Sequence, residues 1–366
     1  MMEKTLPEVC IIQYGFPFDS SKFCSAEGVP LVRIRDVVRG YSETYTTEIA
    51  GENYIVNDGD LLIGMDGEFN IAYWKGGRAY LNQRVCRLIP REDVDRDYIF
   101  YYMPQALKAI EDATPFVTVK HLSAKQLSKI LIPLPDMSEQ QRISAVLRSV
   151  DRVIAMRKKE LDELNNLVKS RFIELFGDPV INPKGFPCCT VGEVIDFQGG
   201  SQPDKKYFEY EPSPDNIRLI QIRDYKSDKY ITYIPKTMAK RFCTADDIMI
   251  GRYGPPIFQI LKGIEGSFNV ALMKATPKMG NKEFVRQFLK QDCLLEYLEG
   301  LSKRTAGQDG IQMDKLKAYP FPYPPIELQE QFAAFVEQTD KSKLAVQKGL
   351  QELEILKKSL MQQYFG

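Results

Sequence analysis

One segment of 51 residues occurs twice in this chain. Residues 127–177 and 316–366 align without a gap and share 15 identities, whereas average residue usage would give about 3 by chance. The identities include Pro133 and Pro322, Pro135 and Pro324, Gln140 and Gln329, and the closing Phe-Gly. The copies lie 189 residues apart, far beyond the spacing of about 20–50 residues in solenoid repeats. The repeat therefore predicts that a globular domain and its helix are duplicated, so that the molecule has two similar functional ends.

The composition limits the class of protein. A length of 366 residues suggests two or three domains, and 44% hydrophobic residues are enough for real cores. No run of about 18 apolar residues occurs and the N-terminus has no apolar signal region, so neither a membrane span nor secretion is expected. The seven cysteines form no CxxC pair, which favours reduced thiols and a cytoplasmic location. The net charge of +0 argues against a strongly basic tail but permits a local basic face.

Each copy of the repeat predicts a long helix with an apolar stripe. Residues 139–176 contain no Pro or Gly, and apolar residues recur at every seventh position, which is typical of a coiled coil. That helix would be about 57 Å long at about 1.5 Å per residue, and its twin is expected over about 327–364. The alternative is that each helix packs only on its own domain. The positions predicted to pair the two helices are Leu147, Ile154, Leu161, Leu164, Val168, Val346, Leu350, Leu353 and Leu360.

The segments before the helices carry matching signals of strands and turns. Ile34-Arg35-Asp36 recurs as Ile222-Arg223-Asp224, Asp60-Leu61-Leu62-Ile63-Gly64 as Asp247-Ile248-Met249-Ile250-Gly251, and Asn82 as Asn269. β-branched runs bounded by Gly and Asp indicate strands. We therefore expect an α+β fold with two similar globular domains and two long antiparallel helices, related by a pseudo-twofold axis. The expected boundaries are 1–136 for the first domain, 137–177 for the central helix, 178–325 for the second domain and 326–366 for the C-terminal helix.

This arrangement resembles the specificity subunit of type I restriction–modification systems, and the resemblance covers nearly the whole chain. Its most specific part is Ile132-Pro133-Leu134-Pro135 followed by Glu139-Gln140 at the start of the long helix. The second copy is looser: Phe321-Pro322-Tyr323-Pro324-Pro325 keeps the prolines, and Gln329 follows. Val119-Lys120-His121-Leu122-Ser123 and residues 306–311 also resemble the family's segment before the final strand of each domain.

The resemblance implies a function and partners. In that family each variable domain is a target recognition domain that reads one half of a split DNA target, while the helices set the gap and dock the modification subunits. The implied partners are double-stranded DNA and two methyltransferase subunits, with restriction or translocase subunits as further partners and no membrane. The chain itself would bind no cofactor and catalyse no reaction, because S-adenosylmethionine, ATP and Mg would be used by the partners.

The search for catalytic motifs agrees with a non-catalytic role. The chain has no GxxxxGK[ST] loop for ATP and no Asn-Pro-Pro-Tyr/Phe motif for a target adenine. His121 is the only histidine, which excludes His-rich metal sites, and its simplest interpretation is a hydrogen-bonded residue at a domain edge. We therefore expect neither a metal site nor catalytic residues.

DNA recognition would need Arg, Lys, Asn and Gln on exposed loops or strands. Arg pairs with guanine edges and Asn or Gln with adenine edges, while Lys and Arg neutralise phosphates. In the first domain the candidates are Arg33, Arg35, Lys75, Arg78, Asn82, Gln83, Arg84 and Lys120. In the second domain they are Arg218, Gln221, Arg223, Arg252, Tyr253, Asn269, Lys303, Arg304 and Gln308. For any single candidate, solvated surface charge is the simpler interpretation, and the recurring Arg-Asp pairs favour a structural role in a shared scaffold.

Two other functions remain open at this point. A coiled-coil scaffold whose two end domains bind protein or carbohydrate ligands would explain the repeats, but not the divergence between the shared signals. An enzyme that acts on DNA unaided is disfavoured by the missing cofactor motifs. Under the first hypothesis, the divergence of the two domains predicts a DNA target with two unlike halves. The expected docking surface for partners on the helices includes Arg157, Lys158, Arg171, Lys357 and Lys358.

Overall fold

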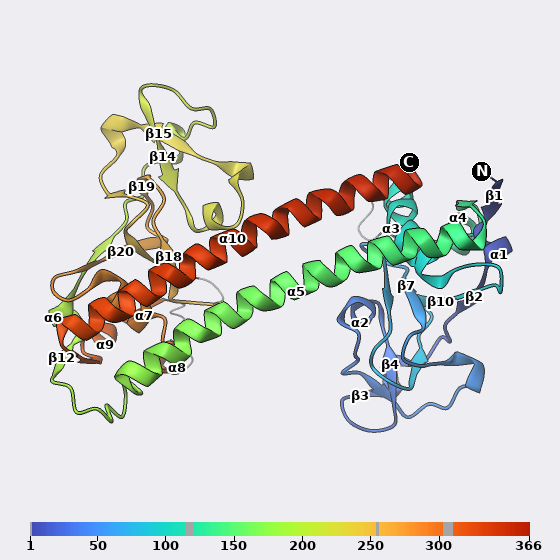
Figure 1. Ribbon diagram of the computed structural model, residues 1–366, viewed down its shortest axis with the longest axis horizontal. Coiled ribbons are helices and arrows are strands. Elements are labelled where there is room, and N and C mark those ends of the chain that lie inside the picture. Colours follow the sequence, from blue (N-terminus) through green and yellow to red (C-terminus); the bar gives the residue numbers. More distant parts are fainter. Residues whose placement is uncertain (1, 115–119, 254–255, 303–309) are drawn as a thin grey trace. The chain divides into compact units, whose positions relative to one another are not determined.

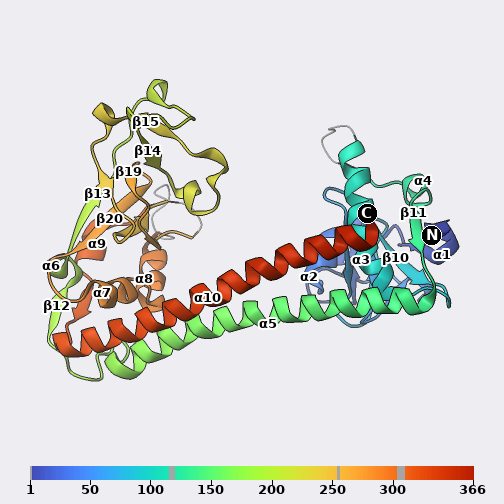
Figure 2. The same ribbon diagram turned by 45° about the horizontal axis from the view of Figure 1, so that its top comes forward.

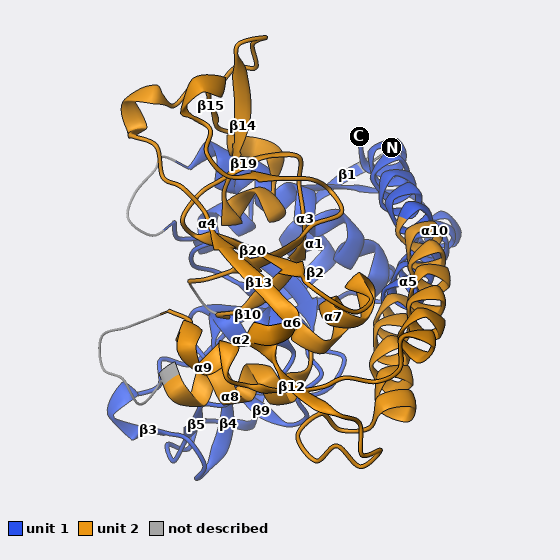
Figure 3. Cartoon of the chain, turned by 90° about the vertical axis from the view of Figure 1, so that its left-hand side faces the viewer, with its two compact units in different colours: residues 1–158, 348–366 blue, residues 159–347 orange. Residues whose placement is uncertain are grey.

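The computed structural model describes residues 2–114, 120–253, 256–302 and 310–366. Contacts between residues divide the chain into two units. Unit 1 comprises residues 1–158 and 348–366, and unit 2 comprises residues 159–347 (Figure 3). The boundaries expected from the sequence kept the long helices apart from the globular domains. In the structure each unit instead includes a part of both helices, because the helix ends pack into the globular cores.

Strands of unit 1 form three sheets within its described residues. The strands are β1 (Met2–Thr5), β2 (Cys10–Tyr14), β3 (Phe23–Cys24), β4 (Val29–Val32), β5 (Tyr45–Thr46), β6 (Ile55–Val56), β7 (Leu61–Gly64), β8 (Asn70–Tyr73), β9 (Ala79–Leu81), β10 (Val85–Pro90) and β11 (Leu131–Leu134). β1 pairs with β11, a four-stranded sheet has the order β2-β10-β7-β8, and a five-stranded sheet has the order β3-β5-β4-β9-β6.

Unit 2 repeats this topology. Its strands are β12 (Cys188–Thr190), β13 (Ile195–Gly199), β14 (Asn216–Ile220), β15 (Tyr233–Pro235), β16 (Phe242–Cys243), β17 (Ile248–Gly251), β18 (Gln259–Lys262), β19 (Gly266–Phe268), β20 (Leu272–Pro277) and β21 (Pro320–Pro322). β12 pairs with β21, and the other sheets have the orders β13-β20-β17-β18 and β15-β14-β19-β16. Each unit has a corresponding parallel pair, β4 with β9 and β14 with β19. The duplication predicted from the helices therefore extends to the sheets.

Short helices connect the strands at matching places. Unit 1 has α1 (Leu6–Val9), α2 (Ile34–Arg39), α3 (Arg96–Ala113) and α4 (Ala124–Leu127), and unit 2 has α6 (Val191–Val194), α7 (Lys282–Leu289), α8 (Asp292–Ser302) and α9 (Met313–Lys317). The 3-10 turns are η1 (Ser20–Lys22), η2 (Glu52–Tyr54), η3 (Lys205–Tyr207), η4 (Ile222–Tyr225), η5 (Asp228–Tyr230) and η6 (Lys236–Met238). The single helix α3 of unit 1 has its counterpart in the two helices α7 and α8.

The two long helices are α5 (Met137–Phe176) and α10 (Ile326–Phe365), each of 40 residues (Figure 1). Their bounds lie within two residues of those expected from the apolar stripes. Contacts in unit 1 pair Arg142 with Tyr364, Asp151 with Lys357, and Lys158 with Glu354. Contacts in unit 2 pair Phe172 with Phe332 and Arg171 with Phe335. As residue numbers rise along α5, the numbers of the contacting residues on α10 fall within each unit, so the two helices run antiparallel. The predicted α+β fold is confirmed.

A buried glutamine joins the start of each long helix to its globular domain. The side chain of Gln140 is 1% exposed; its Oε1 accepts from the Asp95 backbone N–H (2.9 Å), and its Nε2 donates to the Pro135 carbonyl (2.9 Å). Asp95 is the N-cap of α3, and its carboxylate also accepts from the Tyr98 N–H (2.8 Å). A buried amide is stable only when its donors and acceptors are satisfied, which this arrangement achieves with backbone atoms.

Unit 2 contains the same joint. Gln329 is 0% exposed; its Oε1 accepts from the Asn281 N–H (2.8 Å), and its Nε2 donates to the Pro324 carbonyl (2.7 Å). Asn281 is the N-cap of α7. We call these two arrangements the glutamine joints. They explain why the glutamine of each repeat is identical.

The closing phenylalanine of each repeat lies in a core. In unit 2, Phe176 is 4% exposed and packs against the rings of Phe172, Phe284 and Phe332, with centroids 4.7–5.4 Å apart. Figure 2 shows α7 and α8 beside the parts of α5 and α10 that belong to this unit. In unit 1, the corresponding Phe365 is 9% exposed and packs against two tyrosines of α3, Tyr98 (5.3 Å) and Tyr102 (5.6 Å). Each helix therefore begins in one unit and ends in the other.

Candidate nucleic-acid interface

The recurring aspartates hold the loop after the parallel strand of each unit. Asp36 accepts a hydrogen bond from the Arg33 backbone N–H (2.9 Å), and Asp224 accepts one from the Gln221 N–H (3.0 Å). Both carboxylates are nearly buried, at 1% and 6% exposure. Burial raises the pKa of the Asp224 carboxyl, although the Gln221 N–H and the positive charge of Arg218 act in the opposite direction. The two aspartates thus form part of the scaffold.

The recurring arginines are also bound to their own unit. Arg35 Nη2 donates to Thr44 Oγ1 (3.1 Å), and Arg223 Nη2 donates to Thr232 Oγ1 (2.9 Å). In unit 2, Gln221 Nε2 donates to the same Thr232 oxygen (3.1 Å). These contacts agree with the structural role that the recurrence favoured.

The recurring asparagines lie inside tight turns. Asn82 and Asn269 are each 9% exposed. Their Oδ1 atoms accept hydrogen bonds from backbone N–H groups just ahead in the chain, those of Gln83 (2.7 Å) and Ala271 (3.1 Å). An oxygen that stabilises its own turn is not presented to an adenine edge, so the structure places both residues in the scaffold.

A polar cluster projects from unit 1 beside these turns. Asp66 Oδ1 lies 2.5 Å from His121 Nδ1, within hydrogen-bond distance. Arg84 adds its guanidinium, with Nε 3.5 Å from Asp66 Oδ2 and Nη1 3.2 Å from His121 Nδ1. Arg84 and His121 are each 49% exposed. The backbones of Asp66 and His121 form an isolated antiparallel bridge, which brings together residues far apart in sequence. We call Met65, Asp66, Arg84 and His121 corner 1.

Unit 2 has an arginine and a tyrosine at the end of β17. The Arg252 guanidinium lies over the Tyr253 ring, 5.3 Å from its centroid, and Tyr253 is 46% exposed. Arg252 Nε is buried and has no partner among the described residues. The backbone of Tyr253 forms an isolated antiparallel bridge with Gly310. We call Arg252, Tyr253, Ala271 and Gly310 corner 2.

The other basic candidates of the first domain are spread over its surface. Lys75 is exposed on the loop between β8 and β9. On the same loop, Arg78 Nη2 donates to both carboxylate oxygens of Glu52, at 2.8 and 3.0 Å. The Arg33 guanidinium lies over the Phe23 ring, 5.8 Å from its centroid. Exposed ion pairs contribute little stability, so Arg78 can exchange Glu52 for another anion at low cost.

The remaining candidates have mixed surroundings. Gln83 is exposed in the turn that Asn82 stabilises. The Lys120 ammonium donates to the Glu111 carbonyl, and Arg218 Nη2 donates to Asp228 (2.9 Å). Lys303, Arg304 and Gln308 lie outside the described residues.

The positions predicted to pair the helices are all at least half-buried. Leu147, Ile154, Val168 and Val346 are buried, at 0%, 9%, 4% and 8% exposure. Leu161, Leu164, Leu350, Leu353 and Leu360 are half-buried. Leu147 and Leu360 pack in the core of unit 1, and Val168 packs in that of unit 2.

The basic residues expected on the outer helix faces are partly engaged in ion pairs. Lys158 lies 3.7 Å from Glu354, Lys357 lies 2.6 Å from Asp151, and Arg171 lies 2.7 Å from Glu174. Arg157 and Lys358 are exposed. Exposed apolar side chains lie on the same helices: Val153, Met156, Leu167, Ile173, Leu344, Ile355 and Leu356.

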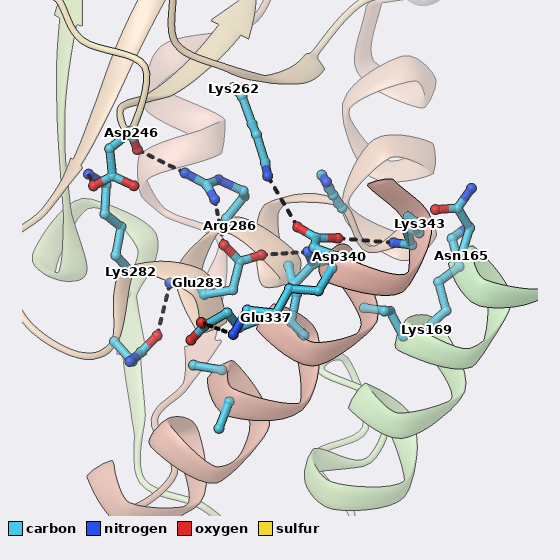
Figure 4. Close-up of a pocket in the computed structure, with 18 of the residues that line it drawn as sticks. Asn165, Lys169, Asp246, Lys262, Lys282, Glu283, Arg286, Glu337, Asp340 and Lys343 are labelled. Atoms are coloured by element: carbon cyan, nitrogen blue, oxygen red, sulfur yellow. Dashed lines mark hydrogen bonds and ion pairs between the residues drawn. The ribbon is translucent and has the colours of Figure 1, made fainter. Parts of the chain in front are cut away.

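Unit 2 also contains a groove lined by α5, α7 and α10 (Figure 4). Its basic groups face acidic ones: Lys262 Nζ lies 3.1 Å from Asp340 Oδ2, and Lys282 Nζ lies 2.5 Å from Asp246 Oδ2. Lys343 also binds Asp340, at 3.3 Å. The lining has seven Lys and Arg side chains and five Asp and Glu side chains, so ion pairs neutralise most of its positive charge and leave only a small excess for a phosphate backbone.

The described residues contain no cluster of three or more His, Cys, Asp or Glu side chains that could hold a metal ion. Burial raises the pKa of the Cys86 thiol to about 12 and that of the Cys243 thiol to about 11, so both are protonated at neutral pH. Among the described helices, none combines the length and the apolar character needed to cross a membrane.

Comparisons with solved structures agree with this architecture. The S subunit of a type I restriction–modification system from M. genitalium has a TM-score of 0.57 and 15% identity, and the match covers 100% of this chain and 96% of that one. A chain from a study of complex assembly and conformational transition of the type I R-M system gives 0.55 and 19%, covering 100% and 97%. At these identities the likeness concerns the fold.

Sequence comparisons add closer relatives. The EcoBI specificity subunit of a type I restriction enzyme from Escherichia coli is 40% identical over 167 residues, which are 45% of this chain and 35% of that protein. The match thus spans about a third of that relative's length. The MjaVIII specificity subunit from Methanocaldococcus jannaschii is 24% identical over 374 residues, or 91% of this chain and 87% of that protein.

The match to a protein family follows the internal duplication. The description of that family is "Type I restriction modification DNA specificity domain", and it fits residues 1–166 and 183–355. The two matched stretches begin with the first strand region of the first domain and just before β12 of the second, and each continues into a long helix. The chain therefore belongs to the family of type I restriction modification DNA specificity domains.

Proposed function

We propose that this chain is the DNA-recognition subunit of a type I restriction–modification complex, in which each globular domain reads one half of a bipartite, asymmetric DNA target. The observation that carries the proposal is the family match in both halves of a chain whose two units share one topology. Two similar domains on one chain suit two half-sites on one duplex. Their unlike surface side chains suit two half-sites of different sequence.

In this proposal the residues that recur in both units hold the fold, and the residues that differ between the corners discriminate between DNA sequences. Asp36 and Asp224 stabilise equivalent loops, and Asn82 and Asn269 stabilise equivalent turns. Residues that bind their own unit are needed whatever the DNA sequence. Sequence discrimination is then left to the polar groups that are exposed and differ between the units.

The long helices have two functions in this proposal. Their paired apolar positions fix the gap between the half-sites, and their outer faces dock two methyltransferase subunits. Exposed apolar residues such as Met156 (60%) and Ile355 (69%) support a docking role, because the two long helices present them next to charged residues. Restriction or translocase subunits would join the same complex.

Catalysis belongs to the partners in this proposal. The methyltransferase subunits use S-adenosylmethionine and the translocase uses ATP and Mg, whereas this chain binds no cofactor and works in the cytoplasm.

The proposal is tested by co-expressing the chain with the methyltransferase subunit encoded beside it and mapping methylated bases in the host DNA by long-read sequencing. The expected result is a split motif with two unlike halves and a fixed gap. Replacing residues 1–136 by the first domain of another family member should then change one half only. A soluble complex that methylates without any motif would contradict the proposal, and so would a replacement that alters both halves.

A further inference from the structure

Corner 1 and corner 2 occupy the same place in their units. The backbone bridge between Asp66 and His121 corresponds to that between Tyr253 and Gly310. One further bond matches: the Met65 N–H donates to the Arg84 carbonyl (3.0 Å), and the Arg252 N–H donates to the Ala271 carbonyl (2.9 Å). The four backbone positions of one corner therefore pair one to one with those of the other.

The scaffold beneath the two corners is also alike. A Cβ atom on Gly15 would lie 2.1 Å from the Asn82 carbonyl oxygen, and one on Gly200 would lie 1.9 Å from that of Asn269. Only glycine permits so close a crossing of two backbones. The same crossing next to each corner fixes the strands in the same arrangement, so differences between the corners lie in their side chains.

All four side-chain positions differ, yet each corner has one guanidinium. In corner 1 it comes from Arg84, whose hydrogen-bonded neighbour is Met65. In corner 2 it comes from Arg252, whose hydrogen-bonded neighbour is Ala271. The arginine therefore occupies different members of the hydrogen-bonded pair in the two corners. In corner 1 it is the residue whose carbonyl accepts the bond, and in corner 2 it is the residue whose N–H donates it.

The groups around each guanidinium are unlike. Asp66 lies against Arg84 Nε, which orients the guanidinium, and no described residue accepts a hydrogen bond from Arg84 Nη2. Tyr253 instead places an aromatic ring beside Arg252, and a Cβ atom on residue 310 would lie only 3.3 Å from that ring. Gly310 therefore makes room for Tyr253, whereas unit 1 has His121 at the equivalent position.

We propose that each corner reads a base edge in the major groove of its half-site, with Arg84 and Arg252 as the readers of a guanine in their respective halves. This inference rests on the proposed function. A guanidinium with a free pair of N–H donors matches O6 and N7 of guanine, which is the commonest specific contact in the major groove. Asp66 and His121 position Arg84, and Tyr253 positions Arg252, so the neighbouring bases accepted by the two corners differ.

The test uses the assembled complex with its methyltransferase subunits and duplexes that carry the mapped motif or a single base-pair change. Arg84→Ala should lower discrimination at one G·C pair of one half-site by about fivefold to 150-fold, and leave the other half-site unchanged. Arg252→Ala should do the same in the other half only. Arg39→Ala is the matched control, since it removes an exposed arginine of unit 1 that lies outside the corner and outside the candidates for DNA contact.

Further variants separate base reading from charge and from folding. Arg84→Lys keeps the charge but loses the two-donor geometry, so it should lose discrimination and keep the dependence of binding on salt. Asp66→Asn should weaken discrimination less than Arg84→Ala, and thermal unfolding of each variant checks that unit 1 is intact.

Two results would overturn the inference. Arg84→Ala could weaken binding equally for every sequence and reduce the salt slope by about one, which is the behaviour of a phosphate contact. Alternatively, both alanine variants could keep full discrimination while the wild-type complex recognises its motif. Both results leave the proposed function standing. A wild-type complex without sequence preference would instead contradict the proposed function itself.

Discussion

Unit 1 and unit 2 agree where a polar side chain holds the scaffold of its own unit, and they differ in the exposed side chains of the corners. The glutamine joints, the loop aspartates and the turn asparagines all bind backbone N–H or C=O groups, and all of them recur. The corners are made of different residues in the two units, whereas the cores share some residues, among them the closing phenylalanines Phe176 and Phe365. The comparison teaches that the contacts that hold the scaffold recur in both units, many of them to backbone groups that do not depend on the neighbouring sequence, while the corners differ.

The largest predicted effect is the loss of stability when the closing phenylalanine is removed from the core of either unit. Phe176→Ala and Phe365→Ala should each lower the free energy of unfolding by about 3–5 kcal/mol, since both remove a buried aromatic ring. The loss should be greater for Phe176, which is 4% exposed and contacts three rings, than for Phe365, which is 9% exposed and contacts two. Urea unfolding gives the two values, and hydrogen exchange identifies the unit that opens.

A suitable control is Phe242→Ala, because that ring is 52% exposed. Hydrogen exchange should show opening of unit 2 for Phe176→Ala and of unit 1 for Phe365→Ala. If Phe176→Ala opened only unit 1, the division of the helices between the units would be wrong.

The glutamine joints should give a smaller and nearly equal loss in both units. Gln140→Leu and Gln329→Leu leave one backbone N–H and one carbonyl without partners, and each such group costs about 1–3 kcal/mol, offset in part by burial of the leucine. Urea midpoints of the two variants measure the effect. Gln141→Leu, at an exposed position of the same helix, serves as the control. A strong effect in one unit and none in the other would break the equivalence of the joints.

The smallest expected effect concerns pH and Asp224. Burial raises its folded pKa above the ordinary value of 3.8, so the folded protein binds this proton more tightly than the unfolded chain. The ionised carboxylate therefore opposes folding at neutral pH. That penalty is relieved as the pH falls through the raised pKa and is gone below 3.8.

Asp224→Asn tests this sign. Asparagine keeps an oxygen that can accept the Gln221 N–H but has no charge, so the stability of wild type relative to the variant should improve as the pH falls from neutral to about 4. Urea midpoints at both pH values give the comparison. A relative loss of wild-type stability on acidification would mean that the charges of Arg218 and Arg223 outweigh burial.

Much of the fold follows from local sequence signals. Both long helices begin and end within two residues of the expected positions, because apolar residues at every seventh position and flanking prolines act locally. The strand β7 was expected from its apolar run between Asp60 and Gly64. The parallel pairing of β4 with β9 could not be predicted, since it joins segments whose register depends on the whole core.

The candidate interface was predicted less completely. The sequence named Arg84, Arg252 and Tyr253, which lie in the corners and whose contact with DNA stays a prediction. It also named Asn82 and Asn269, whose side chains bind their own turns. No local pattern says whether an asparagine faces inward or outward. The contact between Asp66 and His121 was missed because it is made by residues 55 positions apart. The available signal was the equal place of Asp66 and Tyr253 just after an Ile-Gly pair in each domain.

The glutamine joints have a consequence for how such chains can diversify. The side chains of Gln140 and Gln329 bind only main-chain atoms, namely the N–H of a helix N-cap residue and the carbonyl of a proline. Almost any sequence can supply such atoms. A recombined gene could therefore bring in a foreign domain without redesigning the helix that carries it. A glutamine joint of this kind can hold domains of different sequence. New specificities can then arise by exchange of whole domains rather than by gradual change of the residues that contact the helix.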